Sequence, residues 1–473
     1  MYTLGRFSLL LMVEATLLAS GCGGGGITTP PASTANEWTW ISGSNTLDAG
    51  SVYGTQGTAS TANVPGGREY AASWSDTSGN LWLFGGYSGY TANYFNDLWK
   101  FSTASKEWTW VSGSNTGNAV GVYGTRGTAA ATNVPGARLS AVSWIDRSGN
   151  LWLFGGEDQP LNDTVGFLND LWEFSPANNE WTWVGGSSTI NAGGVYGTQG
   201  IASTANIPGA RYGAVSWVDS SGNLWLFGGA MQTAGSLSVF NDLWEFNPAS
   251  KEWTWVSGSN TDNSYGVYGT EGIASQNNVP KSRVSAISWI DGSGNLWLFG
   301  GIGYDTSGSG NLGDLNDLWE FTPANKEWTW VSGSNALNAR GVYGTKGTAS
   351  TTNVPGARDK AVSWTDSSGN LWLFGGTSGQ LDSGGIFSDL WEFSPANKEW
   401  AWVSGSNTGI AVAVYGTQGT ASASNVPGTR WGAVSWTDSS GQMWLFGGDG
   451  FGTNSFGTGG APGDLNDLWR YNP

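Results

Sequence analysis

The chain has 473 residues, a net charge of −17, no histidine and a single cysteine. A nucleic-acid partner is not expected, because phosphate binding needs clustered lysine and arginine and the chain has no basic stripe. Without histidine the chain cannot build a Ser-His-Asp or Cys-His catalytic group, nor zinc or copper sites of ordinary composition. Catalysis would have to use carboxylates, tyrosine, lysine, arginine or an oxygen-ligated cation such as calcium.

The N-terminal residues 1–21 are predicted to be an export signal. Arg6 supplies a positive charge, residues 7–19 form an apolar run, and small residues lead up to Cys22. This ending resembles a bacterial lipoprotein processing site, which implies that Cys22 becomes the lipidated N-terminus. The alternative is an ordinary signal peptide followed by an incidental cysteine.

Residues 22–36 are rich in Gly, Pro, Ser and Thr and are predicted to form a flexible linker. The remaining residues, 37–473, are expected to form one domain that a lipid at Cys22 anchors to the bacterial cell envelope. Gly23 resembles the residue that directs lipoproteins to the outer membrane in organisms with two membranes.

A short phrase with two tryptophans separated by one residue recurs six times. Its first tryptophans lie 70 to 75 residues apart, at Trp38, Trp108, Trp181, Trp253, Trp328 and Trp400. Each repeat contains four short apolar segments bounded by turn residues, and in the second repeat these are residues 139–145, 151–154, 171–174 and 181–184. No segment beyond the N-terminus has a helical period. The repeats therefore predict an all-β fold with four antiparallel strands per repeat.

The motifs in each repeat are an arginine, an apolar strand, Leu-Trp-Leu-Phe-Gly-Gly, a variable loop, Asn-Asp-Leu-Trp and Trp-x-Trp. This order resembles the kelch motif and the central domain of galactose oxidase across residues 37–473. The resemblance implies a six-bladed kelch-type β-propeller. Residues 37–43 match a fourth strand and residues 466–472 match a third strand, so the N-terminal strand is expected to complete the last blade and close the ring.

The resemblance to galactose oxidase implies the fold but not the oxidase activity. That enzyme's copper is held by histidines and tyrosines, with a tyrosine cross-linked to a cysteine, and residues 37–473 contain neither histidine nor cysteine. The recurring Asp-x-Ser-Gly-Asn stretch, as at residues 366–370, is interpreted as a hairpin turn, because its spacing differs from the Asp box of sialidases. No cofactor is predicted, and calcium remains open.

Strand order predicts two faces with different characters. One face carries the short, nearly invariant turns, whereas the other carries the loops that follow each double glycine and differ among the repeats. A rigid scaffold with divergent loops is a usual place for recognition, so the variable face is the candidate site.

An arginine is predicted at the start of each innermost strand on this face, close to the central channel. The six are Arg68, Arg138, Arg211, Arg283, Arg358 and Arg430. One interpretation is a structural pair with the aspartate that opens the third strand, reached across the double glycine over roughly 9.6 Å. The other is an arginine-lined mouth that binds an anionic or hydroxyl-rich ligand.

Aromatic and acidic residues follow some of these arginines. Trp431 and Tyr212 lie at the inner rim with no obvious packing role and are candidates for stacking on a sugar, while Trp431 could alternatively plug the channel. Glu69 and Asp359 are candidate acidic groups, which would disfavour strongly anionic ligands.

Three functions are compatible with these features. The first is a non-enzymatic binding module that recognises a glycan or an envelope or extracellular protein through the variable face. The second is a sugar-modifying enzyme that uses carboxylates and arginines, by analogy with six-bladed kelch proteins that interconvert sialic acid anomers. The third is a structural or adhesive scaffold. We expect a monomer that touches the membrane only through its lipid.

Overall fold

The computed structural model describes residues 35–158, 165–233, 235–304, 310–379, 385–453 and 461–473. Contacts divide the chain after Ser33, so the described residues belong to the second unit, Thr34–Pro473. The predictions for residues 1–21, for Cys22 and for most of the linker lie outside the described residues. The described part contains strands and no helix, in agreement with the all-β prediction.

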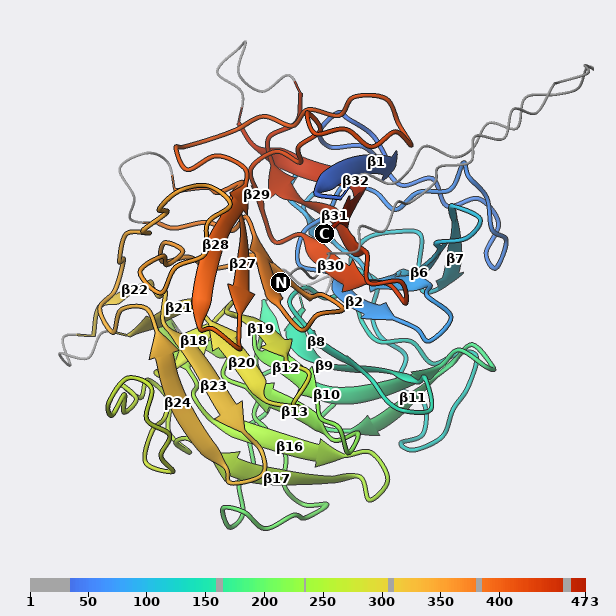
Figure 1. Cartoon of the computed structure of the whole chain (residues 1–473). Helices are drawn as coiled ribbons and strands as arrows, with labels where there is room; N and C mark the ends of the chain where they lie inside the picture. Colours follow the sequence, from blue (N-terminus) through green and yellow to red (C-terminus); the bar gives the residue numbers. More distant parts are fainter. Residues whose placement is uncertain (1–34, 159–164, 234, 305–309, 380–384, 454–460) are drawn as a thin grey trace, which may run out of the picture. The chain divides into compact units, whose positions relative to one another are not determined.

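Six antiparallel sheets, numbered here in chain order, account for most of the strands (Figure 1). Sheet 1 contains β2 (Ala72–Ser75), β3 (Leu81–Phe84), β6 (Leu98–Ser102) and β7 (Glu107–Ser112). Sheet 2 contains β8 (Val142–Ile145), β9 (Leu151–Asp158), β10 (Gly166–Ser175) and β11 (Glu180–Gly185). Sheet 3 contains β12 (Val215–Val218), β13 (Leu224–Phe227), β16 (Leu243–Asn247) and β17 (Glu252–Ser257).

Sheets 4 and 5 repeat the same order. Sheet 4 contains β19 (Ile287–Ile290), β20 (Leu296–Phe299), β23 (Leu318–Thr322) and β24 (Glu327–Ser332). Sheet 5 contains β25 (Val362–Thr365), β26 (Leu371–Phe374), β27 (Leu390–Ser394) and β28 (Glu399–Ser404). The prediction of four antiparallel strands per repeat is therefore confirmed.

Sheet 6 joins the two ends of the unit. It contains β30 (Val434–Thr437), β31 (Met443–Gly450), β32 (Gly463–Asn472) and β1 (Glu37–Ser42), with β29 (Arg430–Trp431) also paired to β31. The strand β1 lies antiparallel to β32, with Trp38 opposite Tyr471. The first strand of the repeat region therefore occupies the fourth-strand position of the sheet formed by the last residues.

Three of the predicted strands of the second repeat have lengths clearly different from those expected. The innermost strand of sheet 2 begins at Val142 rather than at residue 139, because Ser140 has a positive φ of 51° that interrupts the pairing. Conversely, β9 and β10 run beyond residues 151–154 and 171–174 and pair up to Asp158 and Gly166.

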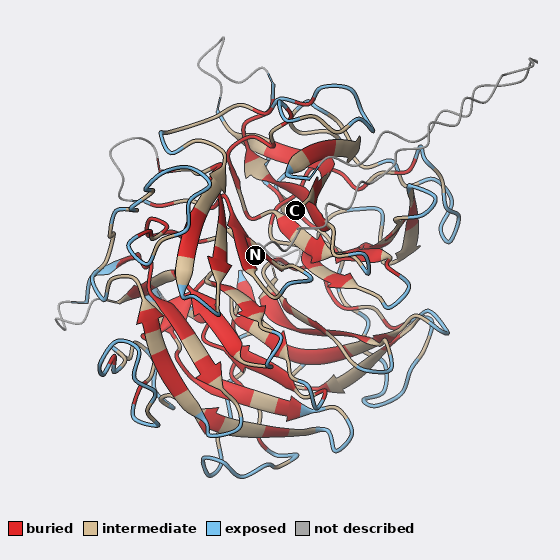
Figure 2. Cartoon of the chain, in the orientation of Figure 1, coloured by how far each residue is buried: buried red, intermediate tan, exposed pale blue. Residues whose placement is uncertain are grey.

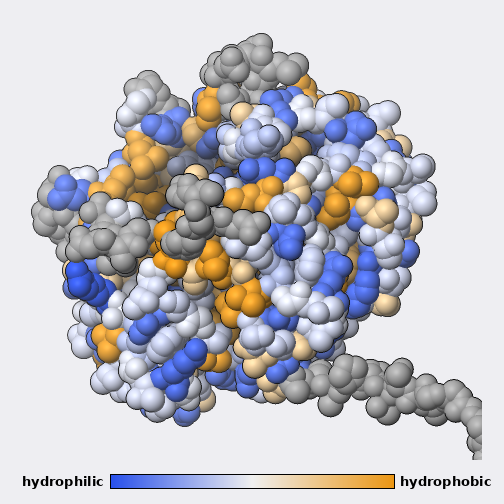
Figure 3. All heavy atoms as spheres, turned by 90° about the horizontal axis from the view of Figure 1, so that it is seen from above, coloured by the Kyte–Doolittle hydropathy of each residue, from blue (hydrophilic) through white to orange (hydrophobic). Residues whose placement is uncertain are grey.

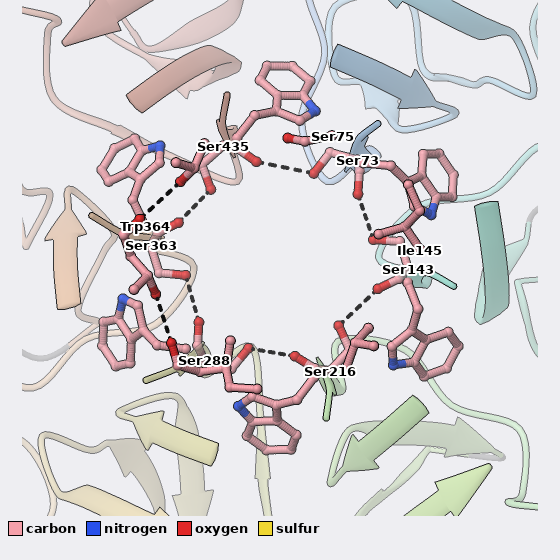
Figure 4. A pocket seen from close by; sticks show the side chains of 18 residues that line it. Ser73, Ser75, Ser143, Ile145, Ser216, Ser288, Ser363, Trp364 and Ser435 are labelled. Atoms are coloured by element: carbon pink, nitrogen blue, oxygen red, sulfur yellow. Dashed lines mark hydrogen bonds between the residues drawn. The ribbon is translucent and has the colours of Figure 1, made fainter. Parts of the chain in front are cut away.

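The innermost strands surround a central channel, to which each contributes a serine (Figure 4). Each serine hydroxyl donates to the backbone carbonyl of the preceding serine at 3.0–3.4 Å, and the series returns to its start at Ser73, Ser143, Ser216, Ser288, Ser363 and Ser435. The tryptophans beside them point away from the channel, and each indole donates across to the next sheet, as from Trp74 to the carbonyl of Trp152 at 3.1 Å. The cavity that these strands line has a volume of about 420 Å³, and its lining is uncharged.

The hydrophobic core lies between neighbouring sheets, in six contact regions that we call seams. Each seam holds one cluster of buried residues that come from two neighbouring sheets. Sheets 6 and 1 are also joined in this way, since Trp436 and Trp444 pack with Trp99 and Trp108. Figure 2 shows the buried residues concentrated in the strands and the exposed ones in the loops. A single sheet could not bury both of its apolar faces alone, so neighbouring sheets stabilise one another.

Two recurring loops have structural roles. In the hairpin of sheet 1, Asp76 accepts hydrogen bonds from the amides of Ser78 and Asn80 and from the Trp82 indole, each at 2.9 Å, which fixes the turn. The long loop before sheet 1 lies along its outermost strand, where the Ser60 amide donates to the Trp108 carbonyl. The long loop therefore covers an edge that would otherwise be open to pairing with another chain.

The surface outside the core is largely uncharged. Charged residues make up 12% of the chain, whereas glycine alone contributes 76 residues. Figure 3 shows one face on which pale residues of intermediate hydropathy predominate, with orange hydrophobic patches among blue hydrophilic ones.

The position of β1 can be tested with Trp38, which is 3% exposed and packs against Trp364 and Trp469. We expect Trp38→Ala to cost about 3–5 kcal/mol, because it leaves a large cavity in the core. The matched variant Trp108→Ala removes the equivalent residue from sheet 1 and should lower the melting temperature by a similar amount. A Trp38→Ala variant with an unchanged melting temperature would show that β1 does not complete sheet 6.

Candidate functional site

The rim is the set of residues at the arginine end of the innermost strands. It comprises the residue after each arginine, which pairs with the residue after the corresponding double glycine: Glu69 with Tyr87, Leu139 with Glu157, Tyr212 with Ala230, Val284 with Ile302, Asp359 with Thr377 and Trp431 with Asp449. In sheets 2 and 6 the long strands run into the rim. At sheets 1, 3 and 4 it is built by β4 (Tyr87–Ser88) with β5 (Asn93–Tyr94), β14 (Ala230–Thr233) with β15 (Ser236–Val239), and β18 (Arg283–Val284) with β21 (Ile302–Tyr304) and β22 (Leu312–Asp314).

A ring of backbone hydrogen bonds closes around the channel within the rim. Six residues with φ between 51° and 63° each donate their amide to the carbonyl of the preceding one at 2.7–3.0 Å: Tyr70, Ser140, Gly213, Ser285, Lys360 and Gly432. Four of the six are small, so Tyr70 and Lys360 carry the only large side chains of this ring. The Lys360 ammonium lies 5.6 Å from the centre of the Tyr70 ring.

The six predicted arginines are buried below the rim, each against the aspartate that opens the third strand. Arg68 donates to both carboxylate oxygens of Asp97 at 2.6 and 2.9 Å, and also to the carbonyls of Gly66 and Gly85. The other five arginines make the same fork, and the side chains of all the pairs are 0–1% exposed. This geometry favours the structural pairing over an arginine-lined mouth, because the guanidinium groups face protein oxygens rather than solvent.

The double glycine allows this arrangement. Gly85 and Gly86 have φ of 69° and 95°, and a Cβ on Gly85 would lie 2.7 Å from the carbonyl oxygen of Arg138 in the next sheet. The Gly86 amide donates to that same carbonyl at 2.9 Å. Close approach of the two backbones therefore requires glycine at this position.

The residue after each arginine packs at the rim end of the seam between two neighbouring sheets. The type of residue at this position differs among the repeats. Leu139 packs with Tyr94, and Val284 packs with Ala230 and Val239. Tyr212 stacks on Phe167, with ring centres 5.2 Å apart and planes at 25°. The expectation that Tyr212 has no packing role is therefore wrong, because the facing strand β10 supplies an aromatic partner.

Two seams contain acids in place of apolar side chains. Glu69 is 8% exposed, Asp359 is 3% exposed, and each has one carboxylate oxygen without a hydrogen-bond partner. Burial, reinforced by the charges of Asp449 and Asp464, raises the pKa of Glu69 from 4.5 to about 8. Burial also raises the pKa of Asp359 to about 7, which the Lys360 ammonium, 3.8 Å from Asp359, opposes.

The carboxylates around Glu69 come from sheet 6. Asp449 and Asp464 are opposite each other in the register of β31 and β32. Burial and the neighbouring Asp464 and Asp48 raise the pKa of Asp449 to about 7. Trp431, whose backbone pairs with Asp449, is half-buried at the same seam. Trp431 therefore remains a candidate for ligand stacking or for covering the channel.

A pocket of about 420 Å³ opens beside the seam that holds Glu69 and Asp449, between the β4–β5 hairpin and the loops before sheets 1 and 2. Its lining includes Asp48, Ser51, Ser88, Tyr90 and Asn93. Tyr90 is 72% exposed, the highest value among the large hydrophobic side chains of the described residues. Ser88, Tyr90 and Asn93 belong to a loop that follows a double glycine, on the face predicted as the candidate site. Sequence reasoning missed Asp48 and Ser51, because their loop is adjacent to the first one only in the folded chain. The available signal was Asp48, since four of the other repeats have asparagine at that position.

Comparison of the sequence with protein-family models and with curated proteins finds no match. Within the described ranges, the structure has no helix that could cross a membrane. The same ranges hold no group of three or more Cys, Asp or Glu side chains arranged to bind a metal ion.

The Arg–Asp fork can be tested in sheet 3, away from Glu69 and its neighbouring carboxylates. We expect Arg211→Met to cost about 3–5 kcal/mol, because it leaves the Asp242 carboxylate buried without its cation. Adding Asp242→Asn should restore part of the melting temperature, whereas Arg147→Met on the exposed hairpin should leave it unchanged. If the double variant lost as much stability as the two single variants added together, the pairing would be contradicted.

Glu69 should make stability depend on pH. Its pKa is raised in the folded state, so the folded protein keeps a proton that the unfolded chain loses. The carboxyl is protonated in both states below about pH 4.5, and stability then falls as the pH rises to about 8. We expect Glu69→Gln to be more stable than the wild type by roughly 1–4 kcal/mol at pH 9 and nearly equal to it at pH 4.

Denaturation followed at both pH values measures this difference. Glu271→Gln, on an exposed loop, is the matched control. A Glu69→Gln gain that is the same at pH 4 and pH 9 would exclude titration of Glu69 as the cause.

Proposed function

We propose that this chain is a six-bladed kelch-type β-propeller, closed by β1 in its last blade, that binds a glycan through its rim. In this proposal it is not an enzyme, and a lipid on Cys22 displays it on the bacterial envelope. The observation that carries the proposal is the contrast within each repeat. The Arg–Asp fork and the double glycine are the same in all six copies, whereas the residue after the arginine changes from Leu139 to Glu69 to Trp431.

A uniform framework with a variable rim supports recognition more than catalysis or simple scaffolding. If the rim only filled space, each seam would be best filled by apolar side chains such as Leu139 and Val284. Glu69 and Asp359 instead place buried acids there, each with one oxygen that accepts no hydrogen bond, which is unfavourable for folding. Side chains that weaken a fold are most often kept for binding or chemistry.

The pocket beside Tyr90 supports a glycan as the ligand. Its lining offers hydroxyl, amide and carboxylate groups next to an exposed aromatic ring. Hydroxyl-rich sugars are held by such polar groups with a ring stacked on their apolar face. The volume of about 420 Å³ lies in the usual range for small-ligand sites.

The enzyme alternative would require a carboxylate in contact with the substrate. Glu69 has the raised pKa expected of a general acid, but its unpartnered oxygen is enclosed by protein atoms. A catalytic group must come within hydrogen-bond distance of the reacting atom. The enclosure of Glu69 therefore argues against sugar modification by this carboxyl group.

A glycan array probed with the full-length protein in detergent tests this function. We expect binding to a defined set of glycans, with about a tenfold loss in Tyr90→Ala, because truncating an aromatic contact typically costs more than 1 kcal/mol. Tyr265→Ala, at an exposed tyrosine of another loop, is the matched control and should bind as the wild type does. Trp431→Ala shows whether the inner rim also contributes. No binding to any glycan would contradict the proposed function.

A further inference from the structure

Four carboxylates converge where sheet 6 meets sheet 1. Asp464 and Asp449 pair across β32 and β31, and Glu69 reaches the same seam from sheet 1. Asp48 joins them from the loop after β1, since its Oδ1 accepts the Asp464 amide at 2.9 Å. We call this group the acidic seam. The side chains within it come from four segments of the chain.

The hydrogen bonds of the acidic seam are incomplete. Asp464 is satisfied, because its Oδ2 accepts the Ser88 hydroxyl at 2.7 Å and the Tyr90 amide at 3.1 Å. Glu69 Oε2 and Asp449 Oδ1 are buried and have no hydrogen-bond partner. Glu69 is more than nine-tenths buried, with this oxygen unpartnered in a seam that it shares with two aspartates. Buried carboxylate oxygens without a donor are costly, so the seam would be stabilised by a positive group.

The protein supplies few positive groups here. The cation that acts on Glu69 and Asp449 is Lys360, which also lies beside Asp359. One ammonium therefore serves carboxylates in two seams. The arginines of the region are already engaged, as Arg68 is with Asp97. Four carboxyl groups share this one ammonium, so the acidic seam has an excess of negative charge once they ionise, which for Glu69, with its pKa of about 8, requires alkaline pH.

The charge of Asp48 is not needed for the fold. The corresponding residues Asn118, Asn191, Asn263 and Asn338 accept the equivalent amide hydrogen bond at 2.8–3.0 Å with a neutral side chain. Asp48 makes this bond with a carboxylate instead, next to a seam that is already acidic. Asparagine would avoid that repulsion, so aspartate at this position points to a function for the charge.

Asp48 also lines the open pocket, which links the acidic seam to the surface. Ser88 and Tyr90, which donate to Asp464, line the same pocket, so a ligand there would lie beside the seam. Its remaining lining includes hydroxyl and amide groups of Ser51, Asn93 and Thr116. Tyr90, which is also among the lining residues, is 72% exposed.

We propose that this pocket binds a sugar residue that carries a protonated amino group. The ammonium pairs with the Asp48 carboxylate next to the seam, the sugar ring lies against Tyr90, and its hydroxyls bond to the neutral polar lining. This inference rests on the proposed glycan-binding function and specifies its ligand. A metal ion is a weaker candidate, because the described residues hold no group of three metal-ligating side chains.

Titration calorimetry on the full-length protein in detergent tests the charge of the ligand. The probes are a glucosamine tetramer with free amino groups and the same tetramer fully N-acetylated. We expect the amino form to bind at least tenfold more tightly than the N-acetylated form. A higher salt concentration should weaken the binding of the amino form, because salt screens the interaction between the charges. Equal affinity for the two tetramers would overturn the inference and leave the proposed function standing.

Variants then test the position of the site. Asp48→Asn installs the side chain of the other repeats, so the fold should keep its melting temperature while affinity for the amino tetramer falls about tenfold. Asp262→Asn removes one acid from a loop of another repeat and should bind as the wild type does. Unchanged binding in Asp48→Asn would overturn the assignment to this pocket.

Two further outcomes separate the inference from the function on which it rests. If a lysine-rich peptide bound as tightly as the amino tetramer, the pocket would recognise positive charge alone. The inference that the ligand is a sugar would then be wrong. If neither tetramer binds and the glycan array is also empty, the proposed function itself fails. Array binding to neutral glycans alone would overturn only the requirement for an amine.

Discussion

Each arginine at the start of an innermost strand holds three segments of chain together, and the rest of the architecture depends on this contact. Its guanidinium spans the double glycine to the aspartate of its own sheet, as from Arg138 to Asp170 at 2.7 Å. Its carbonyl accepts the glycine amide of the preceding sheet, as from Gly86 at 2.9 Å. A charged pair this deeply buried is tolerated because nearly all its donors and acceptors are satisfied. The fork thus fixes the innermost strand, the third strand and the neighbouring sheet at a single point.

This fixed point lies directly below the rim, which explains why the rim tolerates such different residues. The fork and the ring of backbone hydrogen bonds, which includes Tyr70 and Gly432, fix the backbone of the residue that follows each arginine. They therefore also decide which seam that residue enters. The side chain that follows is then free to be leucine, tyrosine, tryptophan or an acid without changing the framework. Rigid support under a variable surface is the arrangement that recognition sites need.

Much of the framework could be predicted from the sequence, because it repeats. The period of the tryptophans and the double glycine indicated the four-stranded sheets, and the spacing of Arg138 and Asp170 was compatible with a pair. The seams could not be predicted in the same way. Glu69 meets Asp449 across 380 positions of sequence, and Tyr212 meets Phe167 in the preceding sheet. A repeat shows which residues are equivalent but not which side of a seam each side chain faces.

The acidic seam lies where the two ends of the folded unit meet, and its energetics differ from those of the apolar seams. Sheets 3 and 4 are joined at the rim by contacts such as Val284 with Val239, which favour folding at every pH. Between sheets 6 and 1, Glu69 faces Asp449 and Asp464, and their mutual repulsion grows as they ionise. The same repulsion would be relieved by a bound cation, so the binding energy of a positive ligand would include the relief of this strain. A ligand at this seam would therefore stabilise the junction of the chain ends, which couples recognition at the rim to the stability of the whole set of sheets.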